Sequence, residues 1–408
     1  MNSKWKSMKV SEFAEVIGGG TPDTKNDQYW NGIIPWVAPS DLTGYNSVYI
    51  SHGAKNISEA GLSSSSTKLI PENSVLLSSR APIGYVALAA NPICTNQGFR
   101  SLVCKKDKID PLFLYYALKV YKPTLEAYAT GATFPELSGS ALKKIEFPVP
   151  PVEEQKEISK ILYSYDQLIE NNTKRIAILE QMAEQIYKEW FVRMRFPGFE
   201  NTKFVKGIPA DWEIIQFQKI VYEVRKGIKK GQINPDIDYV GLEHLPVKSL
   251  ILINWGKGED IDSDKLRFET NDILFCKIRP YLHKVALAPF NGICSTDTII
   301  MRPLEDLYKY YASMIAISNV FVDFADITSN GTKMPRADWK VLKKFQCLYP
   351  GEELLLKFNE IVAPMIEQSQ ILMNENKILE SSRNYLLPRL ISGRLSIEHL
   401  TSKLQETV

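Results

Sequence analysis

The strongest chemical signal in the sequence is a run of basic side chains at 225–231. Four positive charges fall within six residues, with one glycine inside the run and another directly after it. Clustered basic groups beside glycine are suited to gripping the phosphates of a nucleic acid backbone, although a charged run can also simply face solvent. The net charge of +2 does not decide between these, because acidic helices elsewhere can balance a basic face. The residues concerned are Arg225, Lys226, Lys229 and Lys230.

A second set of candidate contacts lies in the first third of the chain, beside predicted turns. Arginine and lysine can contact phosphate and guanine, and side-chain amides can contact adenine. Arg80 ends a strand-like run, so its side chain should leave the sheet edge, to reach DNA or to form a local ion pair. The amides at 96–97 either face a groove or cap a turn, and the loop at 130–133 either meets a phosphate or caps a helix. The candidates are Lys25, Asn26, Arg80, Asn96, Gln97, Arg100 and Thr133.

The sequence contains no pattern typical of a catalytic site. The Pro-Pro pair at 150–151 lacks the flanking residues of an adenine methyltransferase loop, and the three glycines at 18–20 do not form a dinucleotide-binding motif. No ATP-binding loop is present. Short Pro-Asp strings at 22–23 and 235–236 are ordinary turn sequences, whereas metal-dependent hydrolysis needs further converging carboxylates. We therefore expect no catalytic residue, cofactor or metal in this chain.

Cysteine usage and hydropathy point to the cytoplasm. The five cysteines form no Cys-x-x-Cys pair, and the four histidines show no metal-binding spacing, which is typical of reduced thiols without structural zinc. No apolar run follows the charged start of the chain, so no signal peptide is predicted. The longest uncharged stretch, 81–99, contains prolines and amides and cannot form a membrane helix. We expect a cytoplasmic protein without a membrane partner.

An internal repeat of about two hundred residues sets the architecture. The string Val-Ala-Leu-Ala occurs at 86–89 and again at 285–288, and in both copies an arginine precedes it by six positions. Gly131 and Pro135 match Gly331 and Pro335, and Leu-Lys-Lys recurs from 142 to 342. Agreement at offsets of 199 or 200 over so many positions indicates a duplication.

Because the sequence is duplicated, the residues of the second copy that correspond to Arg80 are also candidate DNA contacts. Three basic side chains follow the corresponding strand, and the segment from 330 takes the place of 130–133 with added positive charge. The basic run at 225–231 takes the place of the glycines at 18–20. The further candidates are Lys277, Arg279, His283, Asn330, Lys333 and Arg336.

Each copy has short strands and turns, then a helix, then a proline-rich break before a long helix. The first short helix is predicted at Asp110-Pro111, an N-cap followed by proline at the first helical position. We therefore predict an α+β protein with globular domains at 1–150 and 196–350. Long helices are expected within 151–195 and 351–408.

The long helices carry a heptad ladder. Positions spaced alternately by three and four from 155 to 190 are apolar at nine of eleven places, and the same positions plus 200 are apolar at eight of eleven. This period indicates that each long helix packs against another helix. The alternative is that each long helix packs separately on its own domain. The ladder predicts a kink at Pro364 and an end at Pro388. The expected seam comprises Leu162, Tyr165, Ile169, Asn172, Ile176, Leu179 and Ile186, with Phe358, Val362, Met365, Leu372, Asn376, Leu379 and Leu386.

The polar positions in the ladder predict its direction and register. Asn172 and Asn376 occupy different heptad positions, so they can share a layer only if the helices are antiparallel. That register places Trp190 opposite Phe358, and Tyr165 opposite Arg383 in a possible cation–π contact.

Several motifs resemble those of the specificity subunit of type I restriction–modification enzymes. They are Trp5 with Ile17-Gly-Gly-Gly-Thr-Pro22, Ser79-Arg-Ala-Pro-Ile-Gly84 with Asn96-Gln-Gly-Phe99, Pro148-Val-Pro-Pro-Val-Glu-Glu-Gln155, and the tail Leu387-Pro-Arg-Leu-Ile-Ser-Gly393. The second copy departs from them at 279–281 and 294–297, as expected if the two copies read different DNA.

The resemblance implies a protein with two target recognition domains in a pseudo-twofold repeat, separated by two long antiparallel coiled-coil helices. Each domain would read one half of a split target in double-stranded DNA. Two modification subunits, which use S-adenosylmethionine, would methylate adenine, and a restriction subunit with a motor would join in an assembly that cuts DNA. The chain itself would not be an enzyme. The alternatives are a self-contained DNA methyltransferase or restriction polypeptide, and a coiled-coil adaptor without DNA contact.

Overall fold

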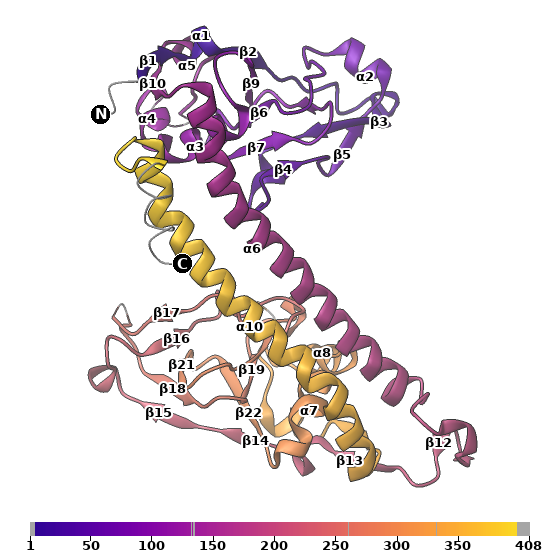
Figure 1. Cartoon of the computed structure of the whole chain (residues 1–408). Helices are drawn as coiled ribbons and strands as arrows, with labels where there is room; N and C mark the ends of the chain where they lie inside the picture. Colours follow the sequence, from indigo (N-terminus) through magenta and orange to yellow (C-terminus); the bar gives the residue numbers. More distant parts are fainter. Residues whose placement is uncertain (1–4, 132, 134, 260, 332, 398–408) are drawn as a thin grey trace. The chain divides into compact units, whose positions relative to one another are not determined.

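The computed structural model describes residues 5–131, 133, 135–259, 261–331 and 333–397 (Figure 1). The chain forms two compact units, one of residues 1–171 and 377–408 and the other of residues 172–376. Each unit therefore contains one globular domain together with a part of both long helices. The chain is α+β, as the sequence predicts.

Among the described residues, the first unit contains ten strands and five short α-helices before the long helix α6 (Val152–Tyr187). Its strands are β1 (Lys6–Lys9), β2 (Ala14–Gly18), β3 (Trp30–Val37), β4 (Tyr49–Ile50), β5 (Lys55–Ile57), β6 (Val75–Leu77), β7 (Val86–Ala89), β8 (Cys94–Thr95), β9 (Arg100–Cys104) and β10 (Glu146–Val149). Its short helices are α1 (Val10–Phe13), α2 (Glu59–Ser64), α3 (Pro111–Val120), α4 (Lys122–Ala127) and α5 (Gly139–Lys144).

The second unit follows the same order and ends in the second long helix, α10 (Glu352–Ile391). Its strands are β11 (Phe204–Val205), β12 (Ile208–Pro209), β13 (Glu213–Gln216), β14 (Val221–Val224), β15 (Lys226–Ile228), β16 (Asp238–Val240), β17 (Gly256–Lys257), β18 (Lys265–Phe268), β19 (Ile273–Cys276), β20 (Val285–Leu287), β21 (Gly292–Cys294), β22 (Thr298–Pro303) and β23 (Gln346–Tyr349). Its short helices are α7 (Lys309–Ile317), α8 (Asn319–Ile327) and α9 (Trp339–Leu342).

The strand pairing shows the duplication directly. Each domain closes its ends with an antiparallel pair, β1–β10 in the first and β13–β23 in the second. Each has a central sheet, ordered β2-β9-β6-β7-β4 in the first domain and β14-β22-β19-β20 in the second. A second sheet in each contains one parallel pair, β3–β8 or β16–β21. The repeat in the sequence is therefore a repeat of topology.

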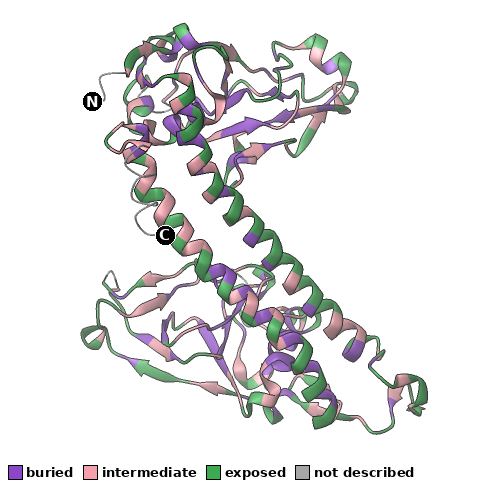
Figure 2. Ribbon diagram, in the orientation of Figure 1, coloured by how far each residue is buried: buried purple, intermediate pink, exposed green. Residues whose placement is uncertain are grey.

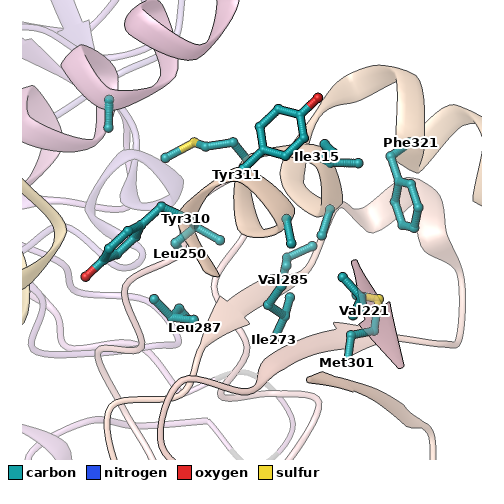
Figure 3. Close-up of a cluster of buried hydrophobic side chains, with 14 of the residues drawn as sticks. Val221, Leu250, Ile273, Val285, Leu287, Met301, Tyr310, Tyr311, Ile315 and Phe321 are labelled. Carbon is teal, nitrogen blue, oxygen red and sulfur yellow. The ribbon is translucent and has the colours of Figure 1, made fainter. Parts of the chain in front are cut away.

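Alternation along the central strands places helices on one face of the sheet and the second sheet on the other. In β19, Ile273 and Phe275 lie in the core with α7 and α8, whereas Leu274 and Cys276 lie in the core with the second sheet. Successive strand residues point to opposite faces, so a strand buried on both faces has a continuous apolar sequence. Figure 3 shows the helix side of this core, with Tyr311, Ile315 and Phe321 on the helices and Ile273, Val285 and Met301 on the strands.

The predicted cap of α3 is present. The side chain of Asp110 accepts a hydrogen bond from the backbone N–H of Phe113 at 2.9 Å, and Pro111 is the first helical residue. Six consecutive residues of the helix, Phe113 to Leu118, are buried in the core of the first unit. Burial of a large apolar side chain contributes about 1.5–3 kcal/mol, so packing rather than the cap dominates the stability of this helix.

Every ladder position of the long helices is buried or half-buried (Figure 2). Within the second unit, residue numbers rise from 172 on α6 to 190 in the helical turn that follows it, while their contacts on α10 fall from 375 to 358. The helices are therefore antiparallel there, and the rings of Trp190 and Phe358 lie 6.0 Å apart, in the expected register. The seam is not free-standing, because Ile176, Ala183 and Trp190 also join the core of the second domain.

Two expectations for the long helices are wrong. Helix α10 continues through Pro388 to Ile391 rather than ending at the proline. Arg383 does not form a contact with the ring of Tyr165 among the recorded interactions of the described residues. Its guanidinium instead donates to the buried carboxylate of Asp166, which also accepts from the hydroxyl of Tyr116. A buried carboxylate must be paired with a cation, whereas an aromatic ring does not need one. Arg383 therefore pairs with Asp166 and not with Tyr165.

Candidate nucleic-acid interface

Three segments of the first domain are tied together by backbone hydrogen bonds at one end of the central sheet. The N–H of Ser79 donates to Gly98 at 2.7 Å, and the N–H of Leu137 donates to Ser79 at 2.8 Å. Thr130 and Glu136 exchange two further backbone bonds, of 3.1 and 2.9 Å. Residues far apart in the sequence are thereby fixed beside one another, and several of the predicted contact residues lie on these segments.

Arg80 and Arg100 share the carboxylate of Glu136. The Nε of Arg80 lies 3.1 Å from one carboxylate oxygen, and Nη2 of Arg100 lies 2.8 Å from the other. Arg100 also donates to the carbonyls of Gln97 and Phe99 at 3.2 and 2.9 Å. The side chain of Arg80 is 48% exposed and that of Arg100 is 19% exposed. Arg100 therefore joins Glu136 to the carbonyls of Gln97 and Phe99 within the domain, whereas Arg80 lies at the surface.

The amide candidates of the first domain have local structural roles. Asn96 accepts from the N–H of Gly98 at 2.8 Å, and Asn26 accepts from the N–H of Gln28 at 3.1 Å. Gln97 accepts from the hydroxyl of Thr21. The turn-capping interpretation therefore describes Asn96 better than a free amide in a groove. Lys25 and Thr133 are exposed, and both remain candidates.

The second domain repeats the same backbone frame. The N–H of Lys277 donates to Asp297 at 2.9 Å, and the N–H of Ala337 donates to Lys277 at 2.9 Å. Asn330 and Arg336 exchange two backbone bonds, of 3.0 and 2.9 Å. This frame borders a recess of about 310 Å³ that is lined by four of the predicted contact residues, Arg225, Lys277, Asn330 and Arg336. Lys333 is exposed on the adjoining loop.

Two candidates in the second domain are placed differently from the prediction. The residue that takes the bridge position of Arg80 is Ile278, which pairs with Arg336 as Arg80 pairs with Glu136. Arg279 lies one position later, exposed and with φ of 49°. His283 is 7% exposed, and its Nε2 lies 2.6 Å from the carbonyl of Ile317. The second copy has one extra residue before β20, and the imidazole turns into the domain, so His283 does not offer a group to DNA.

The basic run is an edge strand and not a loop. Lys226–Ile228 form β15, which pairs with β18 at the edge of the second sheet. Lys229 donates to Asp264 at 2.9 Å, and the backbone N–H of Lys230 donates to the same carboxylate at 3.1 Å. Lys226 is directly opposite Arg267 in the pairing. Like charges opposite one another destabilise a sheet. An anionic partner bound on this face would therefore reduce the repulsion between Lys226 and Arg267.

The charges on Arg225 and Lys229 are only partly balanced. Arg225 is 72% exposed and lies 3.9 Å from Glu223, and Lys229 is 79% exposed beside Asp264. The side-chain hydrogen bond with Lys229 lowers the pKa of Asp264 and raises that of Lys229. Exposed pairs of this kind contribute little to stability and can be exchanged for phosphate contacts.

Sequence reasoning missed the acidic members of this surface. The candidates predicted from the sequence are basic side chains, amides and one threonine, and they do not include Glu136 or Asp297. The signal was present, because Glu136 and Arg336 occupy the same place in the repeat and carry opposite charges. Arg267 was missed because its position opposite Lys226 depends on strand pairing.

No cluster of three or more potential metal-binding side chains exists among the residues that the structure describes. Within the same residues, no helix combines the length and the apolar character needed to cross a membrane.

Comparisons with known proteins connect this geometry to a family. Residues 2–181 match the family model of the type I restriction modification DNA specificity domain. The chain is 34% identical to the MjaIX specificity subunit of a type I restriction enzyme from Methanocaldococcus jannaschii, over 97% of this chain and 94% of that protein. The MjaVIII specificity subunit of the same organism is 22% identical over the same shares of both chains.

A solved structure shows the same fold. The S subunit of a type I restriction–modification system from M. genitalium superposes with a TM-score of 0.64 at 17% identity, over 96% of this chain and 97% of that one. With the sequence similarity to MjaIX along nearly the whole chain, these findings show that the protein belongs to the family of type I restriction enzyme DNA specificity subunits.

Proposed function

We propose that each globular domain reads one half of a split DNA target. The reading surface is formed by the segments that backbone hydrogen bonds join around Ser79 and Glu136 in the first domain, and around Lys277 and Arg336 in the second. The observation that supports this is one backbone frame carrying different side chains in the two domains. Glu136 and Arg336 make the same backbone bonds, to Thr130 and Asn330, yet have opposite charges. A repeated scaffold with exchanged contact groups is what recognition of two different half-sites requires.

The chain would determine where a complex acts, and its partners would perform the chemistry. We propose two modification subunits that methylate adenine with S-adenosylmethionine, and restriction subunits in an assembly that also cuts DNA. The complex would work in the cytoplasm, where it meets chromosomal and incoming DNA.

The test is an exchange of one domain within the assembled complex. Residues 1–150 would be replaced by the matching segment of a relative, and the methylated motif mapped across a genome. Only one half of the motif should change. Replacing 196–350 instead should change only the other half, and a change in both halves after either exchange would contradict two independent readers.

A second experiment separates this function from a self-contained methyltransferase. The purified chain alone should transfer no methyl group to target DNA, whereas the chain with its modification subunits should. Methyl transfer by the chain alone would overturn the division of labour proposed here.

A further inference from the structure

We propose that Glu136 is a positioning residue that fixes Arg80 for reading guanine, and that in the second domain Arg336 takes the place of Glu136 and is itself the reader. This inference rests on the proposed function of the surface, because it assigns roles within the same interface. It concerns one position of the shared frame, at which the two domains present opposite charge.

The backbone at this position is fixed from two sides. In the first domain Glu136 bridges both Arg80 and Thr130, and in the second Arg336 bridges both Ile278 and Asn330. The next residue in each case donates to a residue that follows a central strand, Leu137 to Ser79 after β6 and Ala337 to Lys277 after β19. The backbone position from which the side chain of Glu136 or Arg336 projects is therefore fixed.

In the first domain a relay of contacts orients the exposed arginine. The carbonyls of Gln97 and Phe99 hold the guanidinium of Arg100, which holds one oxygen of Glu136 at 2.8 Å. The other oxygen holds Nε of Arg80 at 3.1 Å. The residues at either end differ in exposure, with Arg100 largely covered and Arg80 half exposed. This series of contacts thus connects the more buried Arg100 to the more exposed Arg80.

The geometry leaves the reading edge of Arg80 available. Glu136 engages Nε, and no hydrogen bond from the two terminal nitrogens of Arg80 is recorded within the described part of the chain. Guanine presents two acceptors, O6 and N7, in the major groove, and the paired N–H groups of an arginine match them. A guanidinium held at Nε presents its fork without needing to be ordered on binding.

In the second domain the arginine stands at the position of Glu136, the acid stands at the position of Gly98, and Ile278 takes the position of Arg80. Nε of Arg336 lies 3.5 Å from a carboxylate oxygen of Asp297, and the arginine side chain is 45% exposed at the recess. Asp297 accepts the backbone bond that Gly98 accepts in the first domain. An acid therefore again lies beside the Nε of an arginine, here at ion-pair distance, but the arginine now comes from the position of Glu136.

The experiment uses the assembled complex with its modification subunits and a library of DNA targets that vary one base at a time. Arg80→Ala should relax discrimination at one guanine of the first half-site by about 5- to 150-fold. Glu136→Gln, which keeps the shape of the side chain, should relax the same position. The double variant should be no worse there than Arg80→Ala, because the acid acts through the arginine. Arg336→Ala should relax one position in the second half-site only.

Glu126→Gln is the matched control, since it removes the exposed partner of Lys122, 3.8 Å away in the same unit, and should leave the motif unchanged. The melting temperature of each variant checks folding, and Arg80→Ala should fold normally because the side chain is half exposed. Additive effects of the two substitutions, or an equal loss at all bases, would overturn the inference. The inference alone fails if domain exchange still changes one half-site while Glu136→Gln and Arg80→Ala leave base discrimination unchanged. If domain exchange changes both halves, the proposed function fails first.

Discussion

Asn172 of α6 donates a hydrogen bond from its side chain to Glu375 of α10 at 3.3 Å. The bond is reciprocated one residue along each helix, where Asn376 donates to Thr173 at 3.2 Å. The two asparagines thus share one polar layer of the antiparallel seam, although each amide bonds to the neighbour of the other. A polar layer of this kind favours one register, because a slip would leave amides facing apolar side chains.

The shared layer predicts energetic coupling between the asparagines. In a double-mutant cycle, Asn172→Ala and Asn376→Ala should show an interaction free energy of about 0.5–3 kcal/mol. The measurement is denaturant unfolding of the full chain and the three variants. Asn172→Ala combined with Phe358→Ala is the control, since these positions lie several turns apart and should be additive within about 0.5 kcal/mol. Additivity of the asparagine pair would show that they do not act as one layer.

The buried ion pair of the first unit predicts a larger effect. Asp166 is 6% exposed and accepts from both Arg383 and Tyr116. Asp166→Ala should lower the free energy of unfolding by about 3–5 kcal/mol, because it leaves an uncompensated buried charge. Glu153→Ala, which removes an exposed pair with Lys156, should cost no more than about 1 kcal/mol. Equal effects of the two substitutions would contradict the assigned role of the buried carboxylate.

The basic edge strand predicts that stability and DNA affinity change in opposite directions. Replacing Lys226 and Arg267 by alanine removes two like charges that face one another across the strands, so thermal stability should rise slightly. DNA binding by the assembled complex should weaken for all sequences. The slope of log affinity against log salt should fall by about 2, since each phosphate contact contributes about 0.9.

Lys229→Ala supplies the comparison for this strand. Its charge is already shared with Asp264 at 2.9 Å, so the salt slope should change less than for Lys226 or Arg267, which face one another across the two strands. An unchanged slope for the Lys226 and Arg267 double variant would place this strand outside the DNA interface.

Glu180 predicts a specific pH dependence of stability. Burial raises its pKa above the ordinary value of 4.5, although hydrogen bonds from Leu250 and Ser249 act in the opposite direction. A carboxyl group with a raised pKa binds more protons in the folded state than in the unfolded state. Its contribution to stability therefore falls as pH rises from about 4.5 through the folded pKa.

Denaturant unfolding of the wild type and Glu180→Gln over a pH series measures this contribution. The stability of the wild type relative to the variant should decrease across that window and be constant above it. Glu353→Gln gives the opposite sign, because the hydrogen bond from Lys357 lowers the pKa of this exposed carboxyl group. A difference between wild type and Glu180→Gln that does not vary with pH would contradict the burial of a proton-binding group at 180.

The sequence by itself determined the duplication, the α+β class and the direction of the long helices. These features depend on local chemistry that the sequence states directly. The heptad ladder follows from the helical period, and the cap at Asp110 and Pro111 follows from the unsatisfied N–H groups of a helix start. The different heptad positions of Asn172 and Asn376 allow a shared polar layer only if the helices are antiparallel.

Only the tertiary structure decided which candidate side chains stand at the surface that we propose reads DNA. Strand pairing, and not sequence spacing, places Ile278 in the position of Arg80 and turns His283 into the domain. The contact between Arg80 and Glu136 joins residues 56 positions apart, and the opposition of Lys226 and Arg267 exists only in the sheet. Ion pairs and cross-strand neighbours depend on angstrom-scale packing between distant segments, which local sequence preferences do not specify.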